Sequence, residues 1–378
     1  MKKIRRPILL VVLLLLLLSQ TPFVYRRYKL RRLSAAIQQL NSERRVAEPS
    51  GFTDYKGVIH VHSFLGGHSS GTFSDIIAAA QANQLQFVIM TEHTEKDFDT
   101  AAMTLQGVHG GVLFINGNEV SAPNGDRTLA LPGEVSIVAY PEEFKNWDTP
   151  GLNGVEVYNV FTNARRINPV VAFFDAVWSK RSYPDLVFAL YLTRPDEGLR
   201  KWDHGLARAR LTGVGGNDAH ANIGVSLKDS AGKTLLGVQL DPYETSFRLV
   251  RMHALIEANK PLDATSLLEA LRAGHGFIGF DFLGDSSGFS FTAENAGERK
   301  IQGDEISLKP ETRLRVQSPV VGRIVILKDG AIVVDESGVS VKDLTVSERG
   351  VYRTEIYLPQ LGLVAKQPWI ISNPIYVR

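Results

Sequence analysis

Between residues 55 and 282 the sequence alternates short apolar runs with segments of helical periodicity, and this alternation constrains the fold more than any other feature. Strand-like runs occupy residues 58–62, 87–91, 112–116, 135–140, 155–158 and 211–215. Between the first two runs, Thr72 followed three residues later by Asp75 predicts the start of a helix over 76–82. The pattern is typical of an α/β fold built as a βα-repeating sheet or barrel.

From residue 289 onward, apolar and polar residues alternate instead. Strand-like runs lie at 289–291, 314–316 and 324–326, and Lys328-Asp329-Gly330 between two apolar runs predicts a hairpin turn. The length of 378 residues allows two domains at roughly 100 to 200 residues each. We therefore expect a C-terminal β-sandwich at 283–378 after an α/β unit at 51–282.

The N-terminus carries an apolar run at residues 8–18, and no charged residue follows until Arg26. This stretch is just long enough to span a bilayer as a helix. A cleaved signal peptide is the alternative, but no small-x-small cleavage site follows Leu18. The sequence predicts a membrane anchor or signal at 1–33 and a polar linker at 34–50, which can begin as a short helix.

Basic residues flank the apolar run almost equally, with four before it and five after it, so the positive-inside rule gives no orientation. A short basic N-terminus before an early apolar run is the usual shape of an export signal. We expect the body to lie on the periplasmic side of a bacterial inner membrane, with the cytoplasmic face as the alternative.

The charge balance argues against nucleic acid as a partner. Nine of the 42 Lys and Arg residues lie in the first 33 positions, which leaves 33 bases against 40 acids in the rest of the chain. Nucleic-acid binding draws its affinity from clustered bases, which this acidic body lacks. The chain has no Cys, which excludes disulfides and thiolate metal ligands.

His60 and His62 lie two residues apart in a strand-like run. The strand period of two predicts that both imidazoles share one face, where neutral imidazole is a good ligand for divalent transition metals. Two exposed strand histidines that bind nothing are the alternative.

Further ligand-type side chains follow other strand-like runs or lie in a Gly-rich loop. They are His68, His93, Glu119, Asp218 and His220. Singly, each has an ordinary explanation as a loop histidine, a capping group or a solvated turn carboxylate. Because they recur where strands end, the edge at which βα folds assemble their sites, the set predicts a divalent metal site.

These motifs resemble those of the PHP (polymerase and histidinol phosphatase) metallohydrolase superfamily. The matching segments are His60-Val-His62, Thr91-Glu-His93, Gly117-Asn-Glu119 and Asn217-Asp-Ala-His220. Residues 213–221, 271–277 and 367–376 make the chain most similar to the branch that includes carbaryl-hydrolase-like and other exported members. The resemblance covers residue 55 to the C-terminus and implies a distorted (β/α)7 barrel with metals at its C-terminal mouth.

The resemblance also implies ligand sets. One metal would be held by His60, His62, Glu119 and Asp218, and another by His68, His93 and His220. Trinuclear relatives use a histidine in an Ala-His-Pro segment, where this chain has Ala139-Tyr140-Pro141. We therefore expect two divalent ions, with Zn, Mn and Fe all compatible with N and O ligands.

The expected activity is hydrolysis by metal-activated water. On family grounds the substrate is a small phosphorylated ester, with carboxylester, amide or carbamate cleavage as the alternative. Loss of the Ala-His-Pro histidine motivates a rival of another class, a non-catalytic exported binding or scaffold protein.

Candidate catalytic residues are Glu92, as general base or as orienter of His93, and Arg194, as a phosphate partner together with Arg165 and Arg166. A loop glutamate and surface arginines without either role are the alternatives. His253 and His275 are expected to be structural.

Overall fold

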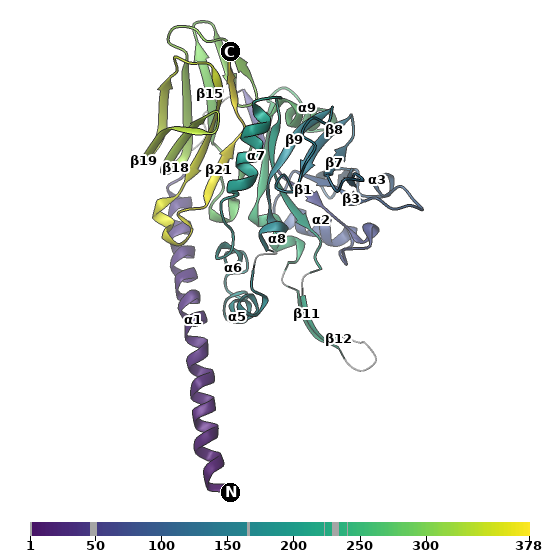
Figure 1. Ribbon diagram of the computed structural model, residues 1–378, viewed down its shortest axis with the longest axis vertical. Coiled ribbons are helices and arrows are strands. Elements are labelled where there is room, and N and C mark those ends of the chain that lie inside the picture. Colours follow the sequence, from purple (N-terminus) through teal and green to yellow (C-terminus); the bar gives the residue numbers. More distant parts are fainter. Residues whose placement is uncertain (1, 46–50, 165–166, 223, 229–233, 240) are drawn as a thin grey trace.

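The computed structural model describes residues 2–45, 51–164, 167–222, 224–228, 234–239 and 241–378. Figure 1 shows a long helix, α1 (Lys2–Ser42), that projects from a body of strands and helices, with the C-terminal strands at the opposite end. The expected mixed α/β class is confirmed, with a large mixed sheet and helices around it.

Six parallel strands form the centre of the body in the order β8–β9–β10–β1–β2–β5. They are β1 (Phe52–Val61), β2 (Phe87–Met90), β5 (Val112–Ile115), β8 (Val135–Ala139), β9 (Leu152–Asn159) and β10 (Thr212–Ala219). Each overlaps one of the predicted runs, so these six strands are confirmed. Their apolar runs are nearly continuous because both faces are covered.

The strands of the body pair with one another in a closed ring. Strand β3 (Glu92–His93) follows β2 after a single residue and pairs with β6 (Asn118–Ser121), which follows β5. Strand β7 (Arg127–Leu131) then runs antiparallel to both β6 and β8. The path β1–β2/β3–β5/β6–β7–β8–β9–β10–β1 is therefore a closed circuit, and β4 (Gly107–His109) pairs with β5 outside it.

Helices follow the strands, as the alternation predicts. Thr72 caps α2 (Phe73–Ala82): its hydroxyl accepts the amide of Asp75, whose carboxylate accepts the amide of Thr72, so this predicted start is confirmed. Ile76, Ala79 and Ala80 form the buried face of α2. The other α-helices of the described body are α3 (Thr100–Met103), α4 (Val160–Ala164), α5 (Pro169–Ser179), α6 (Leu186–Ala189), α7 (Asp196–Leu206), α8 (Tyr243–Leu249) and α9 (Ala264–Ala273).

The C-terminal strands continue the sheet of the body. Strand β13 (Arg251–Glu257) pairs with the first half of β1 and with β14 (Gly276–Gly279), which pairs with β21 (Pro368–Ser372). The rest are β15 (Ser290–Asn295), β16 (Glu298–Ile301), β17 (Glu305–Ile306), β18 (Arg313–Lys328), β19 (Ala331–Thr345), β20 (Gly350–Tyr357) and β22 (Ile375–Val377). Backbone hydrogen bonds thus cross the expected boundary at 282/283, and the division into two domains stays a prediction.

The predicted hairpin at residues 328–330 is confirmed. Strand β18 ends at Lys328 and β19 begins at Ala331. The two residues between them, Asp329 and Gly330, have φ of 49° and 82°. Positive φ at both positions is the geometry of the two-residue turns that join tightly twisted strands.

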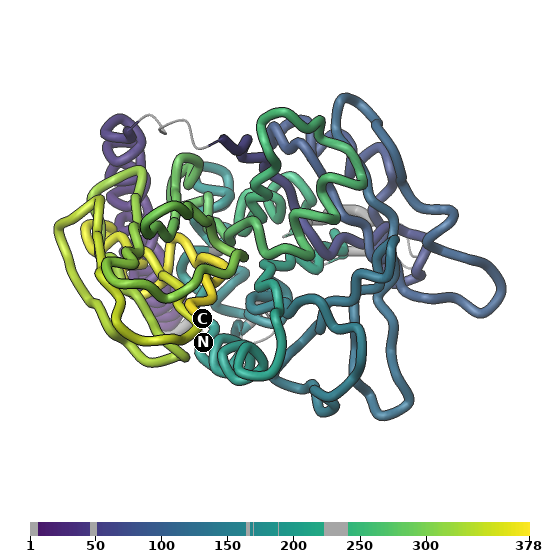
Figure 2. Tube along the Cα trace, turned by 90° about the horizontal axis from the view of Figure 1, so that it is seen from above, coloured from purple at the N-terminus to yellow at the C-terminus, as the bar shows by residue number. Residues whose placement is uncertain are grey.

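Helix α1 differs from the sequence prediction at its C-terminal end. A linker was expected at 34–50, but the helix continues to Ser42. Leu30, Leu33, Ile37 and Leu40 recur at helical spacing and are buried against the main core, so packing holds this segment helical. In Figure 2, which views the molecule from above, α1 lies behind the C-terminal strands. Its first 18 residues contain the long apolar run, none of which is buried.

Candidate metal centre

The predicted ligand residues gather where the strands of the circuit end. His62 follows β1, His93 ends β3, Glu119 lies in β6, and Asp218 lies one residue before the end of β10. His60 lies within β1, and its ring centroid is 5.0 Å from that of His62. His60, His62 and Asp218 are at most 2% exposed.

His60 reaches the same side as His62 through a bulge rather than through regular alternation. Ile59 pairs with Ile89 and Val61 with Met90, so His60 is one extra residue in β1. Its φ of 68° and the φ of 48° at Asp218 place both residues in the left-handed region, which non-glycine residues seldom adopt. Such backbone persists only where its surroundings impose it, and it is frequent at functional sites.

A first group of donor atoms has the spacing of a metal coordination shell. His60 Nε2 lies 3.4 Å from Glu119 Oε2 and 3.5 Å from Asp218 Oδ1. His62 Nε2 lies 3.6 Å and 3.5 Å from the same two oxygens. Ligands at about 2.0 to 2.1 Å from a tetrahedral ion stand about 3.4 Å apart. His60, His62 and Glu119 therefore form one possible ligand set, and Asp218 lies at ligand spacing from both histidines.

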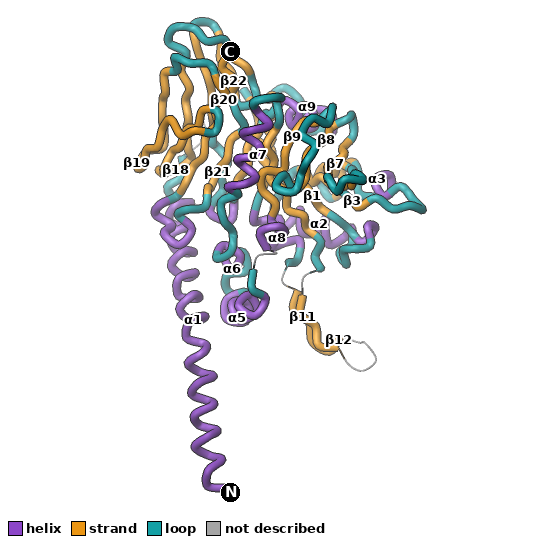
Figure 3. The backbone as a smooth tube through the Cα atoms, in the orientation of Figure 1, coloured by secondary structure: helices purple, strands orange, loops and turns teal. Residues whose placement is uncertain are grey.

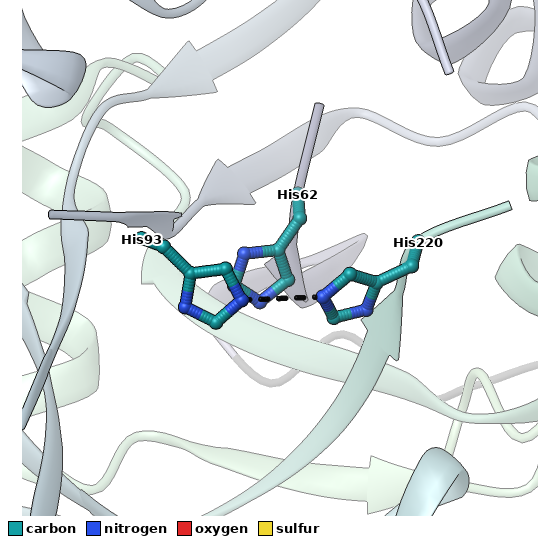
Figure 4. Close-up of side chains that lie close together, drawn as sticks. All are labelled: His62, His93 and His220. Carbon is teal, nitrogen blue, oxygen red and sulfur yellow. Dashed lines mark hydrogen bonds between the residues drawn. The ribbon is translucent and has the colours of Figure 1, made fainter. Parts of the chain in front are cut away.

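A second group consists of His62, His93 and His220, whose rings converge in Figure 4. The Nε2 atoms of His93 and His220 are 3.4 Å apart. The His62 ring stacks on both others, with centroids 4.4 Å and 4.2 Å away. His93 Nδ1 is 3.4 Å from Glu119 Oε2, so that one carboxylate oxygen adjoins both groups.

His68 takes a more peripheral position than the resemblance implies. Its ring meets the His93 ring edge-on at a centroid distance of 5.0 Å, but it belongs to neither group of donor atoms. His62 instead completes the second group. The structure thus brings six of the seven predicted ligands together and leaves His68 beside them.

Several buried polar atoms of the centre have no hydrogen-bond partner in the protein. They are both ring nitrogens of His62 and Asp218 Oδ1. An unsatisfied buried polar atom costs about 1 to 3 kcal/mol. Burial lowers the pKa of His62 to about 3, so its imidazole is neutral and one of its two ring nitrogens offers a lone pair. The donor set therefore fits a divalent cation.

The carboxylates of the first group are held in their charged forms. Burial by itself raises the pKa of Asp218, but His60 and His62 outweigh it and hold that pKa well below its usual range. The pKa of Glu119 falls to about 2, because its contacts with His60 and His62 outweigh burial. Burial lowers the pKa of His60, yet Glu156 and Asp218 raise it well above its usual value. The negative charge of these carboxylates, which favours a proton on His60, also favours a bound metal ion.

Glu156 is the functional side chain that sequence reasoning missed. It is fully buried in β9, and its Oε1 accepts a hydrogen bond of 2.6 Å from His60 Nδ1. This bond turns His60 Nε2 toward the other ligands, as carboxylates behind metal-bound imidazoles commonly do. A Cβ at Gly216 would lie 1.6 Å from Glu156 Oε1, so β10 has room for that carboxylate only because position 216 is glycine. A lone acid inside the apolar run 155–158 was the available signal.

Three other side chains fix the carboxylates of the first group. Tyr140 Oη and Asn159 Nδ2 donate to Asp218 Oδ2 over 2.7 Å and 3.2 Å. Arg127 Nη1 donates to Glu119 Oε1 over 3.1 Å. In each case the other carboxylate oxygen remains for the ligand cluster. Burial, followed by the charges of Asp218 and Glu119, raises the pKa of Tyr140, so this phenol acts as a hydrogen-bond donor.

Glu92 and Arg194, the predicted catalytic residues, both have partners inside the protein. Glu92 is fully buried, accepts the amide of Ser63 over 2.9 Å and the hydroxyl of Thr104 over 2.7 Å, and belongs to neither donor group. Arg194 forms a two-point ion pair with Glu355 of β20. Arg165 and Arg166 lie outside the described residues.

A large cavity adjoins the centre. It has a volume of about 800 Å³, and its lining includes Glu156 and Asn159, which contact the predicted ligands His60 and Asp218, but none of the seven predicted ligands. Arg194 and Lys366 line it as well. This volume is in the range of small-molecule sites.

No family model, curated protein or solved structure matches the chain.

Proposed function

We propose that this chain is a metal-dependent hydrolase of the PHP type, with a phosphoester as its substrate. The observation that carries the proposal is the first donor group, in which four buried side chains have ligand spacing and two of them present atoms without a protein partner. A merely structural cluster would satisfy those atoms internally, because buried polar groups are nearly always paired.

The strand pairings support the fold part of this proposal, a distorted (β/α)7 barrel followed by a C-terminal β-sandwich. The closed circuit counts seven strands when β2 with β3, and β5 with β6, are each taken as one. The ligands collect at the carboxyl ends, which is where barrels of this kind place their sites.

In the proposed enzyme each side chain has a defined task. His60, His62, Glu119 and Asp218 hold one ion, and His93 and His220 join Glu119 around a second, because a neutral imidazole such as His62 has a single lone pair and serves one ion only. Glu156 and Tyr140 orient the ligands they contact. A bound divalent ion supplies an acidified water, with a pKa near about 7, and positive charge for the oxygen of the scissile group.

Cationic side chains favour a phosphoester over a carboxylester, an amide or a carbamate. The Arg127 side chain is 42% exposed while it contacts buried Glu119 and lies over the Tyr140 ring, so it brings positive charge to the surface next to the centre. Guanidinium matches phosphate oxygens in two-point contacts. We assign Arg127 to the substrate phosphate, ahead of Arg194, whose guanidinium is paired with Glu355.

The anchor at the N-terminus belongs to the proposal, with the body on the exported side. Gln20 accepts a hydrogen bond from Trp178, and Phe23 packs against Phe174 with ring centroids 5.1 Å apart. Cleavage of a signal peptide between Phe23 and the basic cluster that begins at Arg26 would remove both of these contacts. These contacts support an uncleaved anchor.

The deciding experiment measures bound metal and hydrolysis on the same protein. Metal-loaded chain should contain Zn, Mn or Fe and cleave bis(p-nitrophenyl) phosphate faster than p-nitrophenyl acetate or an aryl carbamate. Asp218→Asn should lose metal and activity. Asp304→Asn, which removes a carboxylate paired with His275 outside the centre, should keep both.

Each departure from this result has a definite meaning. Protein that binds no metal would contradict the proposal outright. Bound metal without hydrolysis of any ester would favour the binding or scaffold alternative, and cleavage of the acetate or carbamate alone would favour the other hydrolase class.

A further inference from the structure

Helix α5 (Pro169–Ser179) exposes an apolar face outside the metal centre. Val170, Phe173 and Val177 are 63%, 39% and 64% exposed, and their spacing of three and four residues puts them on one side of the helix. On the other side Asp175 is buried. Contiguous exposed apolar surface on a helix marks a contact with something apolar.

Helix α5 lies against α1 just beyond the apolar run. Trp178 donates to Gln20 over 3.1 Å, and Asp175 forms a 3.0 Å ion pair with Arg26. At 1.5 Å per residue, these α1 positions lie only about 3 to 12 Å past Leu18 along the helix axis. Figure 1 shows α5 beside the middle of α1.

This level along α1 has the chemistry of a bilayer surface. Leu18 ends a run of exposed apolar side chains, and Arg26 and Arg27 begin a basic cluster. Trp178, 36% exposed, lies between the two. Tryptophan and arginine at the end of an apolar span are typical of the headgroup layer, in which an amphipathic helix lies with its apolar face inward. The exposed face of α5 is thus continuous with the apolar surface of α1.

The metal centre opens toward the same side. Helices α4, α5 and α6 (Leu186–Ala189) follow the carboxyl end of β9, whose last residue, Asn159, contacts Asp218. Phe161 of α4 lies against His220, with ring centroids 5.8 Å apart. In Figure 3 the helices α5 and α6 lie below the strands, on the side toward which the N-terminal half of α1 extends.

A narrow, mostly apolar pocket connects the two features. It is lined by Val160, Phe161, Leu192 and Leu249 together with the metal ligand Asp218. Tyr191 lines it as well, and the Tyr191 hydroxyl donates to Asp175 of α5 while Arg26 of α1 lies 5.4 Å over its ring. The pocket is small, about 30 Å³, but its lining places the ligand Asp218 and the contact between α5 and α1 side by side.

We propose that the substrate of this centre is a phospholipid of the bilayer that α1 enters, and that the Val170–Phe173–Val177 face of α5 is inserted in that bilayer. The inference rests on the proposed hydrolase function. In the reaction the oxygen of water bonds to phosphorus, the phosphorus–oxygen bond to one alcohol of the diester breaks, and that alcohol takes up the proton. The acyl chains stay in the membrane throughout.

The test compares a lipid with a soluble ester on the metal-loaded full chain in vesicles of phosphatidylglycerol and phosphatidylethanolamine. The triple variant Val170→Ser, Phe173→Ser, Val177→Ser should hydrolyse phosphatidylglycerol at least tenfold more slowly, with bis(p-nitrophenyl) phosphate hydrolysis unchanged within twofold. A control triple, Val108→Ser, Ile332→Ser and Val333→Ser, removes equally exposed apolar side chains elsewhere and should leave both rates unchanged.

Insertion is measured directly, because the chain has no Cys and accepts a single label. A fluorophore on Val177→Cys should be quenched by lipids that carry a quencher in the acyl chain, whereas one on Val108→Cys should not. If the wild-type chain hydrolyses neither the lipid nor the soluble ester, the hydrolase proposal is refuted. Cleavage of the soluble ester without the lipid would refute the substrate inference, and a label at 177 shielded by a second copy of the chain would identify α5 as a dimer contact and refute insertion.

Discussion

His62 shows most directly how single residues combine burial with unmet bonding capacity. Both of its ring nitrogens are buried without a partner, although the ring lies among carboxylates and imidazoles. Replacement of an unsatisfied buried polar group by an apolar group of similar shape is often neutral or stabilising. Stability and metal binding therefore make opposite demands on this position.

We predict that His62→Phe raises or preserves the melting temperature of the metal-free protein and abolishes the rise that added Zn²⁺ or Mn²⁺ produces in wild type. The phenyl ring fills the space and removes two donor atoms. Thermal melts with and without metal measure both effects, and His204→Phe, at an exposed position, should keep the metal response. A variant that still gains stability from metal would exclude His62 from the ligands.

Gly216 tests the role of the carboxylate behind His60. We predict that Gly216→Ala lowers metal affinity by about 10- to 100-fold, because its Cβ would displace Glu156 from His60. The crowding should also lower stability by about 1 to 3 kcal/mol.

The double variant Gly216→Ala, Glu156→Ala separates these effects. Removal of the carboxylate relieves the crowding, so stability should recover while metal affinity stays low. Metal titration and denaturant unfolding on the three proteins give both quantities. Recovery of metal affinity in the double variant would show that Glu156 does not orient His60.

Sequence reasoning singled out the candidate ligands because His, Asp and Glu at strand ends are unusual in type and place. The resemblance put His68 with His93 and His220, whereas the structure puts His62 there, and the bulge at His60 and the left-handed backbone at Asp218 depend on register with neighbouring strands. Sequence reasoning missed Glu156 for the same reason, because a lone acid in a buried strand gains meaning only when His60 lies opposite to it.

Among the secondary-structure elements, those with strong local signals were predicted best. The Thr72 cap and the Asp329-Gly330 turn are determined by short-range chemistry, and both occur as expected. The helical segment at 34–42 was not predicted in full, because it has few apolar residues at helical spacing. Their packing against the main core is what holds the segment helical.

His253 connects three elements and gives the fold a pH-dependent stability. From β13 it contacts Asp54 of β1 over 2.8 Å and Asp281 over 3.3 Å. Burial lowers the pKa of His253, but the two carboxylates outweigh it and raise the pKa to about 9. A raised folded-state pKa stabilises the fold fully below the unfolded value of 6.5, and this contribution is lost as pH rises through about 9.

We therefore predict that the wild-type free energy of unfolding falls by on the order of 3 kcal/mol between pH 6 and pH 10 because of this group. His253→Gln should be less stable than wild type at pH 6 and should show a smaller fall. Urea unfolding at several pH values measures the difference. Equal pH dependence in both proteins would show that His253 is not the titrating group.

At the scale of the whole molecule, the two parts of the body are joined by more than the chain. Strands β14 and β21 pair across them, Arg194 binds Glu355, and Arg353 forms an ion pair of 2.7 Å with Asp203. Arg353 is 2% exposed, and a buried charge left without its partner is strongly destabilising. The expected boundary at 282/283 is therefore a poor place to cut the chain.

The N-terminal helix likewise has two functions that a single cut separates. Residues 7–18 are exposed, whereas Leu30, Leu33, Ile37 and Leu40 are buried in the main core. Burial of one such side chain contributes about 1.5 to 3 kcal/mol, so loss of all four would remove a large part of a typical folding free energy. The sequence-based boundary at residue 50 would discard this packing together with the exposed apolar run.

We predict that a chain starting at residue 19 stays folded without strong detergent and keeps its metal, whereas one starting at residue 51 melts at a much lower temperature or aggregates. The first deletion removes only exposed apolar surface, and the second uncovers the core surface under Leu30 to Leu40. Size-exclusion chromatography, thermal melts and elemental analysis of the two proteins check this.

A control experiment adds a separate peptide of residues 26–45 to the shorter chain. If α1 is a packed element of the body, the peptide should bind and raise the melting temperature. Equal stability of the two chains would instead mean that residues 19–50 only connect the anchor to the body.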